Sequence, residues 1–215
     1  MSDDWLAWHK AAYDDPASKL RERLDRIRWH LSRAIDHAPA GPLRLISLCA
    51  GEGRDVLGVL SGHPRRDDVT AVLVELDARI AEVARRGAAE AGLGQVEVRQ
   101  ADASEVAAFA DALPADVLLL CGIFGNISDG DIERTVRATP ALCADGATVI
   151  WTRNRRPPDV TPRVRAWFAE QRFDEIAFDT IESGPPFTPV SVGVHRLRRA
   201  SPAEPPREPL FTFTG

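Results

Sequence analysis

Two kinds of hydrophobic periodicity divide the chain. Apolar residues recur every three or four positions between residues 20 and 35, which is typical of the buried face of a helix. From Leu43 onward, short continuous apolar runs alternate with further helical segments. We predict β-strands at these runs and at more mixed segments, over residues 43–48, 69–75, 96–100, 116–121, 147–153, 173–180 and 190–197.

The predicted strands indicate the fold class. Strands that are apolar throughout are typical of a parallel sheet with helices on both faces. The last two strands, 173–180 and 190–197, are joined only by a loop rich in proline and glycine, so they must pair antiparallel. We therefore predict a three-layer, doubly wound, Rossmann-like α/β fold. Its seven-stranded sheet is mostly parallel, with one antiparallel strand at or near the edge.

Three helix starts are marked in the sequence. Asp77 is placed to cap the helix that follows the second strand. Ser128 and Asp131 have the spacing of a capping box before the next apolar helical pattern. Thr161 stands directly before Pro162, an arrangement that predicts a threonine N-cap followed by proline in the first turn.

The chain is expected to contain one α/β domain with an extension at each end. The helical pattern at the N-terminus is interrupted at Ala38–Pro42 (APAGP), which marks a boundary. We expect an N-terminal helical lid over residues 1–42 and the α/β domain over residues 43–199. Residues 200–215 are rich in proline and are expected to be irregular, although their segment Leu210–Thr214 (LFTFT) is apolar enough to dock.

The composition and net charge limit the classes of partner that we expect. Hydrophobic residues make up 44% and charged residues 27% of the 215 positions, as in ordinary globular proteins. The net charge of −5 argues against a nucleic-acid partner. No apolar run reaches the roughly 20 residues of a membrane span, and the acidic N-terminus is unlike a secretion signal. We expect a cytoplasmic monomer or homodimer without a membrane partner.

Cysteine and histidine spacing argues against structural metal chemistry. The three cysteines, Cys49, Cys121 and Cys143, are far apart and show no C-x-x-C pattern. The five histidines show no ligand spacing such as H-E-x-x-H. We therefore expect no metal, no disulfide framework and a reducing compartment.

The segment after the first strand carries the strongest chemical signal. In an open α/β sheet ligands bind at the carboxyl ends of the strands, and Gly51 and Gly53 allow close approach of the backbone there. Glu75 ends the second strand, where a carboxylate accepts the ribose hydroxyls of a nucleotide-like ligand. Asp102 ends the third strand, where it either contacts an adenine amine or caps the following turn.

A dinucleotide site is the alternative interpretation of this turn. Its fingerprint requires a third glycine where this chain has Val56. A pyrophosphate also needs a helix start without negative charge, whereas Glu52 and Asp55 lie there. An acidic turn suits a ligand with a positive amine or sulfonium better, so a nicotinamide-dependent oxidoreductase is the weaker hypothesis.

Together these features resemble the class I S-adenosylmethionine-dependent methyltransferases. The resemblance covers roughly residues 43–197, and the segments SLCAGEGRD and CGIFGN are also similar to a group of small actinobacterial methyltransferases. The first motif of the family has an acid and three glycines, but here Ser47 replaces the acid and Cys49 the first glycine. The resemblance implies S-adenosyl-L-methionine as cofactor and methyl transfer to an oxygen or nitrogen of a small molecule. A non-catalytic binding or regulatory module is the alternative that the altered motif leaves open.

The resemblance also implies which residues hold the cofactor. Glu75 would bind the ribose, Leu76 would flank the adenine, and Asp102 would contact the adenine amine. The segment after the fourth strand would line the methionine end. The implied cofactor-binding residues are Ala50, Gly51, Gly53, Glu75, Leu76, Asp102, Ala103, Cys121, Gly122 and Phe124.

Candidates for catalysis and substrate binding lie near the N-terminus and after the fourth strand. Trp5, Trp8 and Tyr13 are expected either to fold over the methyl end of the cofactor or to anchor the first helix. His9 is the candidate base because imidazole titrates near neutral pH. Asn126 is placed to orient the acceptor and is the second catalytic candidate.

Two arginines after the fifth strand are further substrate-binding candidates. Only two of the 27 lysine and arginine residues are lysines, a bias that genome composition explains for most positions. Arg153 and Arg155 are the exception because they follow a strand on the ligand-binding edge. They are expected to bind a carboxylate or phosphate of the acceptor, or else to lie in a solvated loop.

Overall fold

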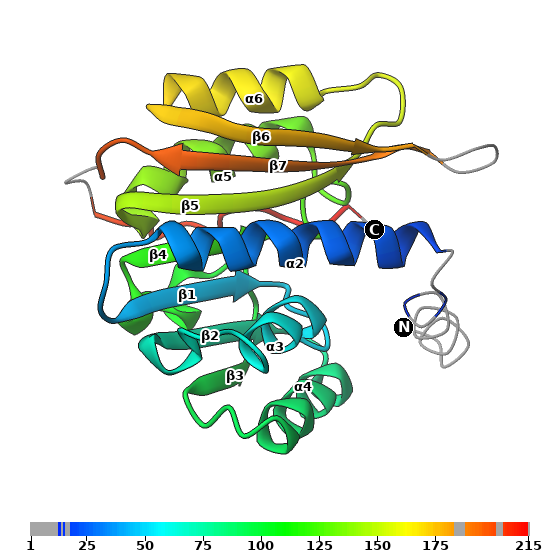
Figure 1. The fold of residues 1–215 in the computed structure, drawn as a ribbon. Coiled ribbons are helices and arrows are strands. Elements are labelled where there is room, and N and C mark those ends of the chain that lie inside the picture. Colours follow the sequence, from blue (N-terminus) through cyan, green and yellow to red (C-terminus); the bar gives the residue numbers. More distant parts are fainter. Residues whose placement is uncertain (1–12, 14, 16–17, 183–187, 201–203, 215) are drawn as a thin grey trace.

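The predicted α/β architecture is present in the computed structural model, which describes residues 13, 15, 18–182, 188–200 and 204–214. The strands form one seven-stranded sheet, seen in Figure 1. The strands are β1 (Leu43–Leu48), β2 (Val69–Glu75), β3 (Val96–Gln100), β4 (Ala115–Leu120), β5 (Cys143–Asn154), β6 (Phe173–Ile181) and β7 (Val190–Leu197).

The strand order is β3-β2-β1-β4-β5-β7-β6. β1 pairs in parallel with both β2 and β4, so the chain order reverses at β1 and the carboxyl ends of these strands share one edge. β7 pairs antiparallel with β5 and with β6, and therefore lies one strand in from the edge. The mostly parallel sheet with one antiparallel strand is confirmed.

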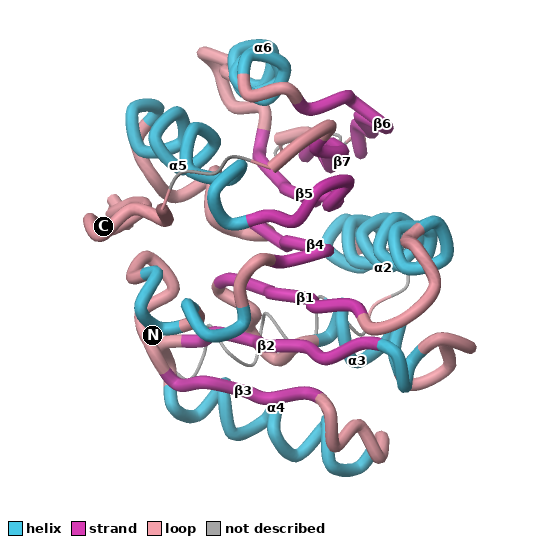
Figure 2. The backbone as a smooth tube through the Cα atoms, turned by 90° about the vertical axis from the view of Figure 1, so that its left-hand side faces the viewer, coloured by secondary structure: helices cyan, strands magenta, loops and turns pink. Residues whose placement is uncertain are grey.

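Helices form a layer on each face of the sheet. The helices are α2 (Lys19–His37), α3 (Arg54–Leu60), α4 (Ala78–Glu90), α5 (Asp129–Leu142) and α6 (Thr161–Glu170). Apolar side chains of α2, α3 and α4 belong to one buried cluster, and those of α5 and α6 belong to the cluster on the other face. Figure 2 shows the two layers with the sheet between them. None of the described helices is long and apolar enough to cross a membrane.

Helix α2 follows from the periodicity at the N-terminus. The Ser18 hydroxyl accepts a hydrogen bond from the Leu20 N–H at 3.2 Å and starts the helix. The apolar stripe that includes Ile27, Leu31 and Ile35 is buried. Helix α2 packs on α3 and on β5 and β7, and its first half lies at the carboxyl edge of the sheet (Figure 1).

Two of the three predicted helix starts agree with the structure. The Asp77 carboxylate accepts from the N–H groups of Arg79 and Ile80, as an N-cap does. The Ser128 hydroxyl accepts from the Asp131 N–H at 3.1 Å. The return bond of the capping box is replaced, because the Asp131 carboxylate instead accepts from the Thr212 N–H at 3.2 Å.

The predicted cap at Thr161 is wrong. The helix starts at Thr161 itself, and Val160 is the flanking residue. The Asp159 carboxylate accepts from both the N–H and the hydroxyl of Thr161, at 2.9 and 2.8 Å. A charged acceptor two residues earlier satisfies the helix start more strongly than the threonine hydroxyl does.

Strand β5 is longer than the predicted range 147–153. Its first residue, Cys143, pairs with Ala115, and regular pairing resumes only at Val117 with Thr148. The polar residues in this irregular stretch interrupt the apolar pattern on which the prediction depended. Gly146 adopts a φ of 76° there, which a residue with a side chain rarely adopts.

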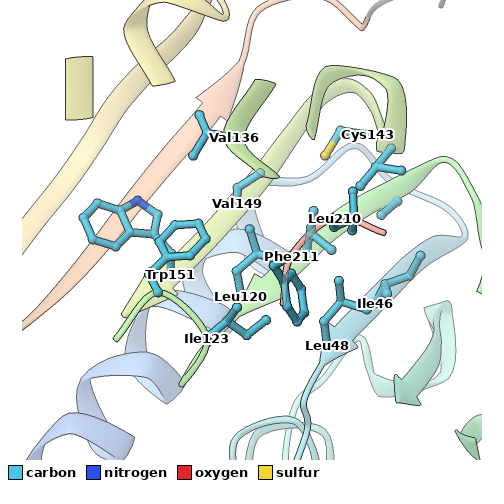
Figure 3. Close-up of a cluster of buried hydrophobic side chains, with 14 of the residues drawn as sticks. Ile46, Leu48, Leu120, Ile123, Val136, Cys143, Val149, Trp151, Leu210 and Phe211 are labelled. Atoms are coloured by element: carbon cyan, nitrogen blue, oxygen red, sulfur yellow. The ribbon is translucent and has the colours of Figure 1, made fainter. Parts of the chain in front are cut away.

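The C-terminal tail completes the core between β3 and β4. This connection contains only the short 3₁₀ turns η2 (Val106–Ala108) and η3 (Ala110–Ala112). Leu210 and Phe211 are each 1% exposed and belong to the same cluster as core residues of β1 and β4 (Figure 3). The Leu210 carbonyl also accepts from the buried Thr135 hydroxyl at 3.0 Å. The apolar end of the tail therefore docks on the sheet.

Candidate functional site

A cavity of about 380 Å³ lies at the carboxyl ends of β1, β2 and β4. Its walls come from the first half of α2, the glycine turn after β1, Glu75 at the end of β2 and the loop after β4. The volume lies in the range of roughly 300–1,000 Å³ that is usual for small-molecule and cofactor sites. This position is also the one where open α/β sheets bind ligands, next to the reversal of strand order at β1.

A larger hollow of about 550 Å³ lies between α5, α6 and the tail, away from this edge. No residue of the glycine turn or of the strand carboxyl ends lines it. Two of its charged side chains, Arg137 and Glu170, pair with each other at 3.3 Å. The smaller cavity is therefore the candidate site.

The backbone of the turn after β1 enters the left-handed region three times. The φ angles are 54° at Cys49, 58° at Gly51 and 68° at Gly53. These are the three positions at which the family motif has glycine. Cys49 adopts this conformation although it has a side chain, at a cost of roughly 1–2 kcal/mol for an L-residue. The backbone at Cys49 thus has the same left-handed φ as at the two glycines.

The backbone at Gly53 also lies close to a neighbouring side chain, which leaves no space for a Cβ. A pair of variants tests this close approach. A Cβ at Gly53 would lie 2.7 Å from Cδ2 of Leu73, whereas a Cβ at Gly51 has nothing within 4 Å. We expect Gly53→Ala to lower the free energy of unfolding by about 2–4 kcal/mol, since strain and overpacking combine. Gly51→Ala is the matched control and is expected to cost only about 1–2 kcal/mol. Urea denaturation measures both, and equal losses would contradict the role of the close approach.

Glu75 joins the glycine turn to the end of β2. Its Oε2 accepts from the Gly51 N–H and its Oε1 from the Asp77 N–H, both at 2.9 Å. The side chain lines the cavity. A carboxylate oxygen has two lone pairs, so each oxygen is able to accept one more hydrogen bond from a ligand. The structure thus places Glu75 and Gly51 together, as the sequence predicted.

Several residues implied for the cofactor lie outside the cavity lining. Asp102 is exposed, and its Oδ1 accepts from the Ser104 N–H at 2.9 Å, which is the capping role left open above. Leu76 is 63% exposed. Ala103 and Phe124 are buried in the core. Ala50, Cys121 and Gly122 do line the cavity with Gly51 and Glu75, whereas Gly53 acts through the turn.

The two cysteines of the cavity are protonated thiols. Burial and, to a smaller extent, the charges of Glu75 and Asp102 together raise the pKa of Cys49 to about 12. Burial also raises the pKa of Cys121 well above its usual value. Because the thiolate is the nucleophilic form, neither side chain is suited to nucleophilic chemistry at neutral pH.

The loop after β4 is fixed from two sides. Asn126 lines the cavity, and its side-chain Nδ2 donates to the Gly122 carbonyl at 2.7 Å. The Gly122 N–H donates to the Thr152 hydroxyl of β5 at 2.9 Å. The N–H and hydroxyl of Thr214, in the tail, both donate to the Asn126 carbonyl, at 2.9 and 3.0 Å. The position of Asn126 therefore depends on the tail as well as on β5.

Arg153 and Arg155 do not line the cavity. The Arg153 guanidinium donates to the Phe124 carbonyl and pairs with Asp129 at 3.6 Å. The Arg155 guanidinium donates to Asp159 at 2.8 Å and to the Thr180 hydroxyl at 3.2 Å. Both side chains thus link loops and strands of the protein, which is a different role from the acceptor binding that was expected.

The predicted N-terminal candidates are described only in part. Trp5, Trp8 and His9 lie outside the described residues. Tyr13 lines the cavity, where its hydroxyl accepts from Nη2 of Arg23 at 2.8 Å. The Arg54 guanidinium lies over the Tyr13 ring, 5.2 Å from its centre.

Arg23 and Asp55 are among the cavity residues that were not predicted as site residues. Arg23 lies on α2, where the sequence shows it only as one polar position between apolar ones. Asp55 lies on α3, is 8% exposed, and accepts from the Val56 N–H through Oδ1 at 2.8 Å. Burial raises the pKa of the Asp55 carboxyl. The sequence signal that could have marked Asp55 as a site residue is its position two residues after Gly53, the last glycine of the turn.

No protein-family model and no curated protein matches the sequence. Solved structures match the fold. Magnesium protoporphyrin IX methyltransferase (ChlM) from Synechocystis PCC 6803, solved with bound SAM, superposes with a TM-score of 0.68 at 9% identity. That match covers 91% of this chain and 92% of ChlM.

Two further structures are similar. The N-methyltransferase NodS from Bradyrhizobium japonicum WM9 has a TM-score of 0.61 at 13% identity, over 82% of this chain and 95% of NodS. Sp1610 from Streptococcus pneumoniae is provisionally assigned as a tRNA (m1A22) methyltransferase and was solved with S-adenosyl-L-methionine. It has a TM-score of 0.56 at 16% identity, over 85% of this chain and 75% of Sp1610. The chain has the fold of the class I methyltransferases.

Proposed function

We propose that the protein binds S-adenosyl-L-methionine in the cavity at the strand ends and transfers its methyl group to an acceptor. The observation that carries the proposal is the contact between Glu75 and Gly51. It places a carboxylate with free lone pairs beside a left-handed turn that a ligand is able to approach closely. Three structural neighbours with the same fold are methyltransferases by name, and two of these were solved with this cofactor.

The residues of the chain act mainly by positioning. The cofactor supplies a methyl group activated on a positively charged sulfur. Glu75 holds the ribose hydroxyls in this proposal. The glycine turn lets the backbone lie close to the ligand. Leu20, Leu24 and Ile27 of α2 form an apolar wall of the cavity that excludes water. Holding acceptor and methyl group at reacting distance in a dry site supplies much of the acceleration of such a transfer.

The acceptor that we propose is a small molecule with an oxygen or nitrogen nucleophile. The named neighbours act on different acceptors, a magnesium porphyrin and, by assignment, a tRNA, so the fold does not select one class. The net charge of −5 favours a small molecule over a nucleic acid. Among the described residues that were predicted to bind the acceptor, Tyr13 and Asn126 line the cavity. We propose that these two contact the acceptor.

Replacing Glu75 tests cofactor binding. We expect Glu75→Ala to weaken binding of S-adenosylhomocysteine by about 1–3 kcal/mol, roughly 5- to 150-fold, because polar groups lose their partners. Titration calorimetry measures this affinity. Glu82→Ala, at an exposed position of α4, is the control and is expected to bind as the wild type does. An unchanged affinity in Glu75→Ala would remove the ribose assignment.

Turnover separates an enzyme from a binding module. We expect S-adenosylhomocysteine to form when the protein is incubated with the cofactor and a panel of carboxylic acids, phenols and amines. A protein that binds the cofactor but converts it with no acceptor of the panel would favour the non-catalytic alternative.

A further inference from the structure

Five charged side chains line the candidate cavity: Arg23, Glu52, Arg54, Asp55 and Glu75. Three of them are in an ion pair or accept hydrogen bonds on both carboxylate oxygens. Nε of Arg54 donates to Oε2 of Glu52 at 2.5 Å, so these two charges compensate each other. Glu75 accepts from two backbone N–H groups. The charged side chains that remain are the carboxylate of Asp55 and the guanidinium of Arg23.

Asp55 is a buried carboxylate without an ion-pair partner among the described residues, and the charges of Arg28 and Arg23 favour its ionised form less than burial opposes it. Its Oδ1 accepts from the neighbouring Val56 N–H at 2.8 Å, and no side chain in the described part of the chain donates a hydrogen bond to it. Burying a carboxylate without a partner is costly, and burial raises the pKa of Asp55 accordingly. A positively charged ligand group at this place would remove the cost.

Arg23 has a hydrogen-bond donor that lacks an acceptor among the described residues. Its Nη2 donates to the Tyr13 hydroxyl at 2.8 Å. Its Nε is buried and has no hydrogen-bond partner among the described residues. A guanidinium has five N–H donors in a rigid fork that matches the two oxygens of a carboxylate. A ligand carboxylate would therefore satisfy the unpaired donor.

The two charges face one cavity from neighbouring helices. Arg23 comes from α2 and Asp55 from α3, and these helices pack on each other. No ion pair joins the two side chains within the described residues, and the Arg23 charge favours the ionised Asp55 carboxylate only from a longer distance. A group that carries both an ammonium and a carboxylate fits a pair of opposite charges separated in this way.

We propose that Asp55 and Arg23 form a recognition site for a zwitterionic α-amino acid group, with Asp55 binding the ammonium and Arg23 the carboxylate. The inference rests on the proposed function, because it assigns this pair to the amino acid end of the cofactor. Ser47, which stands at the acid position of the family motif, is 1% exposed and carries no charge. The carboxylate of this chain's site thus comes from helix α3 and not from the end of β1.

A pair of ligands that differ only at the amino acid end tests the assignment. S-adenosylhomocysteine carries the zwitterionic group, whereas 5′-methylthioadenosine keeps the nucleoside and the sulfur but lacks it. Calorimetry is carried out with wild type, Arg23→Met, Asp55→Asn and the double variant. Arg21→Met, which removes an arginine that pairs with Asp25 on the same helix, is the matched control. Melting temperatures check that each variant is folded.

We expect each single variant to weaken S-adenosylhomocysteine binding about 10- to 100-fold, as for a charged hydrogen bond, and to leave 5′-methylthioadenosine binding within about twofold. The control should bind both ligands as the wild type does. Losses of the same factor for both ligands, or no loss for either, would overturn the assignment while cofactor binding itself stands. A wild type that binds neither ligand would instead overturn the proposed function.

The melting temperature of Asp55→Asn gives an independent readout. Without ligand, we expect it to equal or exceed that of the wild type, because the variant removes a buried charge that has no ion-pair partner among the described residues and keeps the shape of the side chain. A clear decrease would indicate that Asp55 stabilises the fold and would count against a ligand-binding role. If Asp55→Asn does not fold, the ligand comparison with Arg23→Met still decides the assignment of the carboxylate.

Discussion

Replacing Phe211 by alanine is expected to lower the free energy of unfolding by about 3–5 kcal/mol, the usual cost of removing a buried phenylalanine. Phe211 is 1% exposed and belongs to the core cluster that includes Leu48 and Leu120 (Figure 3). The tail that carries it covers the part of the sheet where only short 3₁₀ turns connect β3 to β4.

Phe213 is the matched control for this prediction. It lies two residues further along the same tail and is 47% exposed, so Phe213→Ala is expected to cost less than about 1 kcal/mol. Urea denaturation at one pH measures both variants. A loss below about 1 kcal/mol in Phe211→Ala would show that the tail does not contribute to the core in solution.

The same tail links stability to the candidate site. Thr214 donates two hydrogen bonds to the Asn126 carbonyl, and Asn126 lines the cavity. Release of the tail in Phe211→Ala is therefore expected to weaken binding of S-adenosylhomocysteine also in the fraction of molecules that stays folded. Calorimetry below the unfolding transition measures this effect.

The second large effect concerns His195 and the stability of the protein in acid. His195 lies on β7 with 1% exposure, and its ring stacks on Phe168 at 4.4 Å between centres. Burial lowers its pKa from 6.5 to about 4, against a smaller opposing effect of Glu175. Neither ring nitrogen has a hydrogen-bond partner among the described residues. The folded protein therefore holds this imidazole neutral.

The consequence for stability has a definite sign. Between pH 6.5 and 4 the unfolded chain protonates His195 and the folded chain does not, so acid favours unfolding. The contribution is fully present above pH 6.5 and is lost as the pH falls toward 4. A pKa shift of this size corresponds to about 3 kcal/mol.

A variant without the titrating ring isolates this contribution. His195→Phe keeps an aromatic ring in the stack and removes the proton site. Between pH 7 and 4, its free energy of unfolding is expected to fall by about 3 kcal/mol less than that of the wild type. Urea denaturation of both proteins at several pH values gives the comparison. Parallel pH curves would contradict a buried neutral histidine at this position.

Much of the fold could be predicted from local pattern. The bounds of β1, β2, β3 and β7 agree with the predicted strands. The segments of β1 and β2 are mostly apolar, whereas those of β3 and β7 alternate apolar residues with polar residues or glycine. The prediction for β5 was too short, since Asp145 and Gly146 interrupt the apolar pattern and the first residues of the strand pair irregularly with β4. The helix start at Thr161 was misassigned because the Asp159 carboxylate, two residues earlier, accepts from both the N–H and the hydroxyl of Thr161, so the hydroxyl acts as a donor and not as the cap.

The candidate site was predictable where it depends on one turn and one strand end. Gly51 and Glu75 could be placed together because β1 and β2 are adjacent parallel strands that end at the same edge. Arg153 was assigned to a ligand on the same argument. Its position at a strand end did not reveal that the Phe124 carbonyl and Asp129 engage its guanidinium.

The sequence by itself determined the order and type of the elements, and with them the sheet and the edge at which a ligand binds. Periodicity records which face of each element is buried, so these features are encoded locally. Only the tertiary structure decided that Arg23 and Asp55 line one cavity and that Phe211 fills the core. Such contacts join residues far apart in the chain, and their distances are set by how whole elements pack on one another.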